Sequence, residues 1–132
     1  MRKEMQLEHA NITVSNIDNS LEFYSALFHF KERWRGQVPG GNQPTVRALH
    51  IGNDNVYLAL FEAEKPGRAP IDYATSGINH IGFVVDDIEP YRQRLIDLGV
   101  DIHFEPGYKP GKRFYFYDPD GIEIELVAYT HE

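Results

Sequence analysis

The 132-residue chain contains no cysteine. A disulfide framework, a thiolate metal site and a cysteine nucleophile are therefore excluded. Any metal ion would have to be bound by histidine, aspartate, glutamate or water, and these ligands suit a hard or borderline divalent ion.

Positive charge and long apolar runs are also scarce. The chain has 13 Lys and Arg against 20 Asp and Glu, which gives a formal net charge of -7. We therefore expect neither a nucleic acid nor a membrane surface as partner. No apolar run approaches the roughly 20 residues needed to span a bilayer, and the N-terminus lacks the apolar core of a signal peptide. A cytoplasmic protein that binds small molecules or other proteins is expected.

Hydrophobic residues make up 42% of the chain and aromatic residues 13%. This content is enough for one compact domain with a real core, and the chain is too short for two ordinary domains. We therefore expect a single domain over residues 1–132.

The first half of the chain, about residues 5–63, has the pattern of a strand, a helix and three further strands. Apolar residues alternate along 7–14 and recur at helical spacing after the turn residues SNIDNS. The helix is expected to begin near residues 18–20 and to end around His29. The remaining strands are expected at 31–34, 45–51 and 56–61, with a Gly- and Pro-rich loop at 36–44.

After a polar linker at 64–77, the second half, about residues 78–130, repeats this order. The expected strands are 81–85, 100–104, 113–117 and 122–128, and a helix with an apolar stripe from Ile88 to Leu98 is expected to stop at Gly99. When the two halves of the sequence are aligned, His9 matches His80 and Val14 matches Val85 at the same spacing. The segment VYLALF of the first half aligns with IEIELV of the second. The repeat predicts an α+β fold of two βαβββ modules in tandem, which form a curled mixed sheet with helices on its outer face.

The alternation of the strands also predicts a site. His9 and His80 point away from the helices, and in the last strand Glu123 and Glu125 share that side. If the modules pair into one curved sheet, two imidazoles and one carboxylate can bind a divalent metal and leave positions open. Taken singly, such residues more often belong to a wetted sheet surface, so this alternative stays open.

Several segments resemble the vicinal oxygen chelate superfamily, which includes glyoxalase I, bleomycin-resistance proteins, fosfomycin-resistance thiol transferases and extradiol dioxygenases. These segments are HANITVSNIDNSLEFYSALFHF, NVYLALFE, INHIGFVVDDIEPYRQRLIDLGV and FYFYDPDGIEIEL. The resemblance implies paired βαβββ modules around a metal-holding cavity, and a homodimer. By position, the metal ligands are His9, His80 and Glu125, and the cofactor is one divalent ion, Ni, Zn, Mn or Fe(II).

Some family members add a fourth ligand from the last strand of the first module. The residue at that position here is Ala59, which cannot coordinate a metal. Glu62 and Glu64 lie close by in the sequence and are the alternatives for a fourth ligand. Without one, glyoxalase-type proton transfer is in doubt, and a three-ligand site resembles the fosfomycin-modifying and extradiol-cleaving branches instead.

Further residues are candidates for the pocket. Tyr115 could reach into the hollow as a hydrogen-bond donor and catalytic residue, or could serve only in aromatic packing. The residues expected to contact a substrate are Trp34, Tyr57, Ala59, Phe61 and Arg113. His50 and His103 are available as acid/base groups, although the sequence places neither in the pocket.

Two functions follow from these features. The first is a metal-dependent, Lewis-acid enzyme of lyase, transferase or dioxygenase type that acts on a small substrate with vicinal oxygens. The alternative is a metal-free protein that sequesters a ligand in an aromatic-lined groove, as bleomycin-resistance proteins do.

Overall fold

A computed structural model describes residues 4–67, 72–107 and 111–129 of the chain. The chain divides into two compact units, Met1–Gly67 and Arg68–Glu132, here called unit 1 and unit 2. The boundary falls inside the linker predicted at 64–77. Each unit is described by itself.

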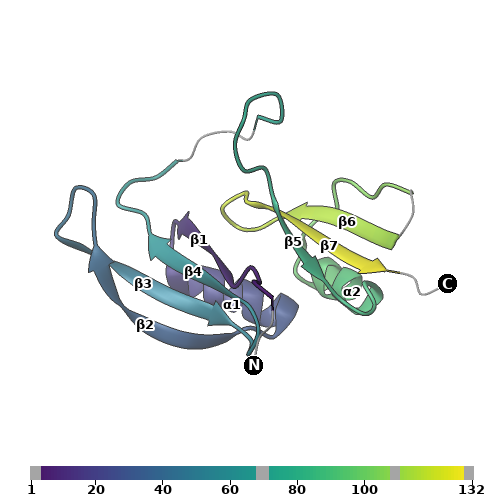
Figure 1. Ribbon diagram of the computed structural model, residues 1–132, viewed down its shortest axis with the longest axis horizontal. Helices are drawn as coiled ribbons and strands as arrows, with labels where there is room; N and C mark the ends of the chain where they lie inside the picture. Colours follow the sequence, from purple (N-terminus) through teal and green to yellow (C-terminus); the bar gives the residue numbers. More distant parts are fainter. Residues whose placement is uncertain (1–3, 68–71, 108–110, 130–132) are drawn as a thin grey trace. The chain divides into compact units, whose positions relative to one another are not determined.

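Unit 1 is a four-stranded mixed sheet with one helix (Figure 1). The sheet has the order β1-β4-β3-β2, in which β1 and β4 run parallel and the other neighbours run antiparallel. Its elements are β1 (His9–Val14), α1 (Ile17–Phe28), β2 (Lys31–Pro39), β3 (Thr45–Gly52) and β4 (Tyr57–Glu62).

The first helix starts and stops where local hydrogen bonding dictates. The side chain of Asn16 accepts a hydrogen bond from the backbone N of Asn19 at 3.0 Å and so caps the first turn. Helix α1 therefore begins at Ile17, slightly before the predicted start. It ends at His29, which adopts a left-handed conformation with φ 59° and donates its backbone N–H to the last turn.

Helix α1 covers one face of its sheet (Figure 1). Ile17, Tyr24 and Leu27 are fully buried in it, and Val14 and Leu60 are fully buried in the sheet. Because successive side chains of a strand point to opposite faces, this packing leaves the other residues of β1 and β4 on the face without a helix.

Unit 2 repeats the arrangement with a three-stranded mixed sheet (Figure 1). The order is β5-β7-β6, with β5 parallel and β6 antiparallel to the central β7. Its elements are β5 (Ile81–Val84), α2 (Glu89–Asp97), β6 (Gly111–Tyr117) and β7 (Glu123–Tyr129). The fold class predicted from the sequence, α+β with tandem βαβββ-type modules, is confirmed.

The register of the two units matches the sequence repeat. In unit 1, Asn11 of β1 lies opposite Ala59 of β4. In unit 2, Gly82 of β5 lies opposite Glu125 of β7. These are the pairs that the repeat lays over each other, so Ala59 and Glu125 occupy equivalent places in their sheets.

Two local predictions are wrong. The strand expected at 100–104 is reduced to a single bridge between Phe104 and Tyr115, because Pro106 and Gly107, which are poor strand residues, follow after one residue. The loop expected at 36–44 is shorter, since β2 continues to Pro39 in pairing with β3. Neither helix among the described residues is long and apolar enough to cross a membrane.

The cap of α1 can be tested by mutation. Asn16→Ala removes the side-chain acceptor and is expected to lower the free energy of unfolding by about 1 kcal/mol, measured by urea denaturation. The control Asn16→Asp keeps an acceptor oxygen and should stay close to the wild type. Equal losses in both variants would show that the cap does not stabilise the helix.

Candidate functional site

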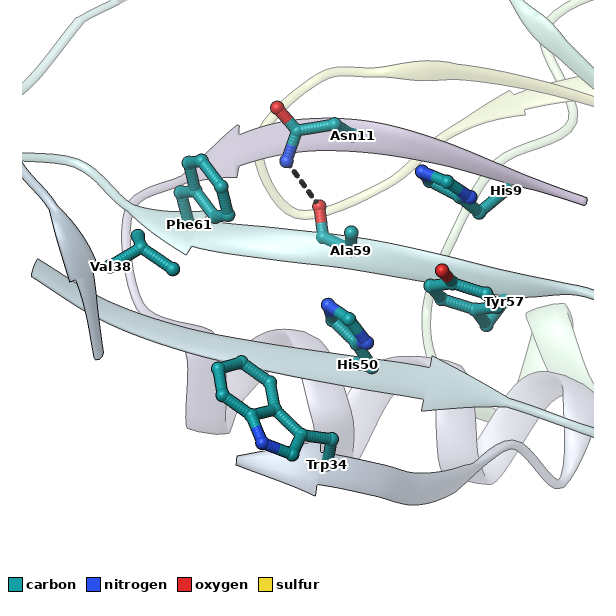
Figure 2. Close-up of a pocket in the computed structure, with 8 residues that line it drawn as sticks. All are labelled: His9, Asn11, Trp34, Val38, His50, Tyr57, Ala59 and Phe61. Carbon is teal, nitrogen blue, oxygen red and sulfur yellow. Dashed lines mark hydrogen bonds between the residues drawn. The ribbon is translucent and has the colours of Figure 1, made fainter. Parts of the chain in front are cut away.

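Unit 1 carries a hollow of about 590 Å³ on the face of the sheet without a helix. Figure 2 shows its lining side chains, which come from all four strands of the sheet. None of them carries a permanent charge, so the hollow suits an uncharged ligand group. The lining residues are His9, Asn11, Trp34, Val38, His50, Tyr57, Ala59 and Phe61.

Four aromatic rings of this hollow form a row that follows the strand order. His9 stacks on Tyr57 with ring centroids 4.7 Å apart, and Tyr57 stacks on His50 at 4.9 Å. Trp34 lies 5.0 Å from His50 at the end of the row (Figure 2). The guanidinium of Arg33 lies 4.4 Å from the centroid of Tyr57. Each ring thus limits the rotation of its neighbour.

Polar contacts accompany the row at His9 and beside it at Asn11. His9 Nδ1 lies 3.0 Å from Glu8 Oε1, which leaves the other ring nitrogen, Nε2, outside that contact. The amide of Asn11 donates to the carbonyl of Ala59 at 2.8 Å (Figure 2). Burial, followed by the neighbouring His9, lowers the pKa of His50, which favours the neutral form of this imidazole.

Unit 2 has a denser polar cluster, centred on Glu125 in the middle of its sheet. Glu125 Oε1 lies 3.0 Å from His80 Nε2, and Oε2 accepts a hydrogen bond from Arg113 Nη1 at 3.1 Å. Glu125 is only 8% exposed. The rings of Tyr115 and His80 meet edge to face, with centroids 5.3 Å apart and an angle of 90° between their planes. A buried carboxylate therefore has a cation on one oxygen and an imidazole nitrogen facing the other.

Glu123 forms a second buried carboxylate in the same strand. Its Oε2 lies 2.6 Å from His103 Nε2, and its Oε1 accepts a hydrogen bond from the hydroxyl of Tyr73. The same hydroxyl oxygen lies 3.2 Å from His80 Nδ1. Burial, followed by the bond to Glu123, raises the pKa of Tyr73 to about 12, so the phenol keeps its proton and can donate it to the carboxylate.

The candidate residues fall into two groups. Unit 1 brings together His9, Trp34, Tyr57, Ala59 and Phe61, and unit 2 brings together His80, Arg113, Tyr115 and Glu125. Among the described residues, no group of three or more His, Asp or Glu side chains is arranged to hold a metal ion. The ligand set of His9, His80 and Glu125 draws on both units and stays a prediction.

Glu62 and Glu64, the alternatives for a fourth ligand, are engaged elsewhere. Arg47 donates to both oxygens of Glu62, at 2.9 and 2.7 Å, and the backbone N of Ile17 donates to Oε2 at 3.1 Å. Glu64 accepts backbone hydrogen bonds from Gly41, Asn42 and Gln43 and so holds the loop after β2. Both carboxylates have structural partners on unit 1.

Three residues near the candidate groups are not placed there by the sequence: His50 and His103, which it offers only as available acid/base groups, and Tyr73. The alternation of Leu49 and Ile51, which are fully buried, could have placed His50 on the opposite face with Ala59. Tyr73 and His103 lie in irregular segments, where no periodicity predicts the direction of a side chain. The ring of His103 stacks on that of Tyr117, with centroids 4.1 Å apart and an angle of 9° between their planes. This stacking restrains the His103 side chain.

Comparisons with known proteins cover most of the chain. The family model of the Glyoxalase/Bleomycin resistance protein/Dioxygenase superfamily matches residues 6–126. Glutathione transferase FosA of Serratia marcescens is 32% identical over 124 residues, which are 91% of this chain and 78% of that protein. A probable lactoylglutathione lyase of Synechocystis is 29% identical over 126 residues, covering 93% of this chain and 95% of that protein. The crystal structure of SMU.1112c is similar with a TM-score of 0.73 and 27% identity, covering 95% of this chain and 99% of that one.

The ion pair at Glu62 predicts a pH dependence of stability. The hydrogen bonds from Arg47, together with that from the Ile17 amide, lower the pKa of Glu62 below its ordinary 4.5. The stabilisation is therefore complete above about pH 4.5 and is lost as the pH falls through the lower folded-state pKa. Glu62→Gln should be less stable than the wild type at neutral pH, and the difference should shrink in acid.

Denaturation of both proteins from neutral to acid pH measures this difference. Glu22→Gln, an exposed position on α1, is the matched control and should not change the acid branch of the profile. A constant difference between Glu62→Gln and the wild type at every pH would contradict the role given to the ion pair.

Proposed function

Because the chain belongs to the Glyoxalase/Bleomycin resistance protein/Dioxygenase superfamily, we propose that it is a metal-dependent enzyme acting on a small substrate with two adjacent oxygens. The observation that carries this proposal is the buried carboxylate of Glu125, whose Oε1 faces Nε2 of His80 at 3.0 Å. A nitrogen and an oxygen donor at this separation suit a borderline divalent ion such as Ni, Zn, Mn or Fe(II).

The contacts around the pair support a ligand role. Arg113 occupies Oε2 of Glu125, so Oε1 is the oxygen available to a metal. His9 is the third ligand that the family resemblance implies, contributed by this chain or by a second copy. Glu8 lies at Nδ1 of His9, an arrangement that leaves Nε2 for a metal and is usual for metal-binding histidines.

The substrate-binding role of unit 1 rests on the chemistry of its hollow. The row from His9 to Trp34 offers flat, polarisable surfaces, and Val38 and Phe61 add apolar ones. A substrate whose remaining part is apolar or aromatic and uncharged would match these residues. When bound, the metal would supply Lewis-acid stabilisation of negative charge on a substrate oxygen.

The chain's own residues would position the reacting groups. Arg113 holds the Glu125 carboxylate, and the edge of Tyr115 limits the rotation of the His80 ring. Ala59 offers no base at the position equivalent to Glu125, and Glu62 and Glu64 are bound to other groups. These features favour a transferase or dioxygenase type of reaction over glyoxalase-type proton transfer.

Metal uptake tests the proposal directly. The metal-free wild type, titrated with Zn, Ni, Mn and Fe(II), is expected to bind one ion per chain, measured by elemental analysis and calorimetry. His80→Ala and Glu125→Gln should each weaken binding by about 100-fold or more, because each removes a donor from a small ligand set. His50→Ala, a change in the hollow but outside the ligand set, should bind as the wild type. A wild type that takes up none of the four ions would refute the proposal.

Assays of glyoxalase activity test the type of reaction. The metal-loaded wild type is expected to show no turnover of the hemithioacetal of methylglyoxal and glutathione, since no carboxylate base is available at position 59. The assay is run on samples whose metal content has been measured, so that a negative result is not due to missing metal. Turnover that is lost in Glu125→Gln would contradict this assignment.

A further inference from the structure

The cluster of unit 2 contains a row of hydrogen bonds that the proposed ligand set does not use. It runs from Nδ1 of His80 to the hydroxyl of Tyr73 at 3.2 Å, and from that hydroxyl to Oε1 of Glu123. On the far side, Oε2 of Glu123 lies 2.6 Å from His103 Nε2. Glu123 is 7% exposed.

The direction of these bonds follows from the number of protons. An ionised carboxylate can only accept hydrogen bonds, and a phenol has a single proton to donate. Tyr73 therefore donates to Glu123, and its oxygen accepts a hydrogen bond from His80. In the neutral imidazole, this assignment places the single proton of His80 on Nδ1 and leaves a lone pair on Nε2.

The lone pair on Nε2 points at another acceptor. Oε1 of Glu125 lies 3.0 Å away and carries no hydrogen of its own when ionised. Two acceptors at this distance repel each other unless a positive group lies between them. The pair is thus arranged for a cation.

We propose that Tyr73, held by Glu123, fixes His80 with its proton on Nδ1 and so prepares Nε2 to bind the metal. The proposal rests on the proposed function and gives Tyr73 and Glu123 the role of positioning residues. Neither residue binds the metal. Both act through the imidazole of His80.

The surroundings of Glu123 make it a fixed anchor for this purpose. It sits opposite Tyr117 in the β6–β7 ladder, and Tyr117 stacks on the ring of His103. His103 in turn faces the second oxygen of Glu123, so both oxygens have partners. A carboxylate held in this way can keep the Tyr73 hydroxyl at one distance from His80.

The face of the His80 ring is also restrained. Tyr73 lies roughly parallel to it, with centroids 6.4 Å apart and an angle of 28°, and Tyr115 meets it at 90°. A flip of the imidazole would put Cδ2 in the place of Nδ1 and Cε1 in the place of Nε2, and the bond to Tyr73 would be lost. The stacking and the hydrogen bond therefore favour the same ring orientation.

The test compares Tyr73→Phe and Glu123→Gln with the wild type in zinc affinity and in the NMR spectrum of ¹⁵N-histidine-labelled, zinc-loaded protein. The wild type should show His80 bound through Nε2, with an Nδ1–H proton that exchanges slowly with water. Both variants should lose the protection of that proton and bind zinc about 10- to 100-fold more weakly. The control Tyr117→Phe removes the hydroxyl of the residue opposite Glu123 in β6 and keeps the ring that stacks on His103. It should match the wild type in zinc affinity and in the protection of the Nδ1–H proton.

The outcomes separate this inference from the proposed function. Zinc uptake by the wild type together with unchanged affinity in both variants overturns the positioning role alone, as does a His80 bound through Nδ1. No uptake by the wild type overturns both proposals. The amide spectra of the same samples verify folding, and Tyr73→Phe carries the test if Glu123→Gln does not fold.

Discussion

A carboxylate in a protein interior is costly unless positive charge or hydrogen-bond donors compensate it. Glu125 and Glu123 meet this constraint with different partners, although they stand two residues apart on one strand. Glu125 has the guanidinium of Arg113, and Glu123 has His103 and Tyr73. The side chains of His80, Arg113, His103 and Tyr73 lie around these two anions, so the site depends on their compensation.

The alternation of the strands explains why both anions lie on one face. Ile124 lies between them and Leu126 follows Glu125. Both are fully buried on the other face of the sheet, opposite Phe116 and Phe114 of β6. Any shift of β7 by one residue would send these apolar residues to the polar side and the glutamates into the core. The hydrophobic packing of the unit therefore fixes the register that brings Glu125 to His80.

Much of the fold could be read from the sequence, and the site only in part. Periodicity predicted α1 and the strands β1, β4 and β7, because one face of each is buried against apolar residues. It also placed His80 and Glu125 on a common side of their sheet. The alternating residues before Phe104 led to the wrong prediction of a strand at 100–104. Alternation alone does not show that the Pro-Gly pair that comes after Phe104 ends the strand pairing. Tyr73 could not be found, because an irregular segment has no period from which the direction of a side chain follows.

The equivalent pairs in the two sheets differ in how they share space. Unit 1 has a large polar residue on the first strand, Asn11, and a small one, Ala59, on the last. Unit 2 has the reverse order, with Gly82 beside Glu125. A side-chain carbon added at Gly82 would lie 3.9 Å from Oε1 of Glu125, within ordinary contact of the carboxylate. The large polar residue thus lies on the first strand of one module and on the last strand of the other, and the space at Gly82 would admit a small side chain beside Glu125 without displacing the carboxylate.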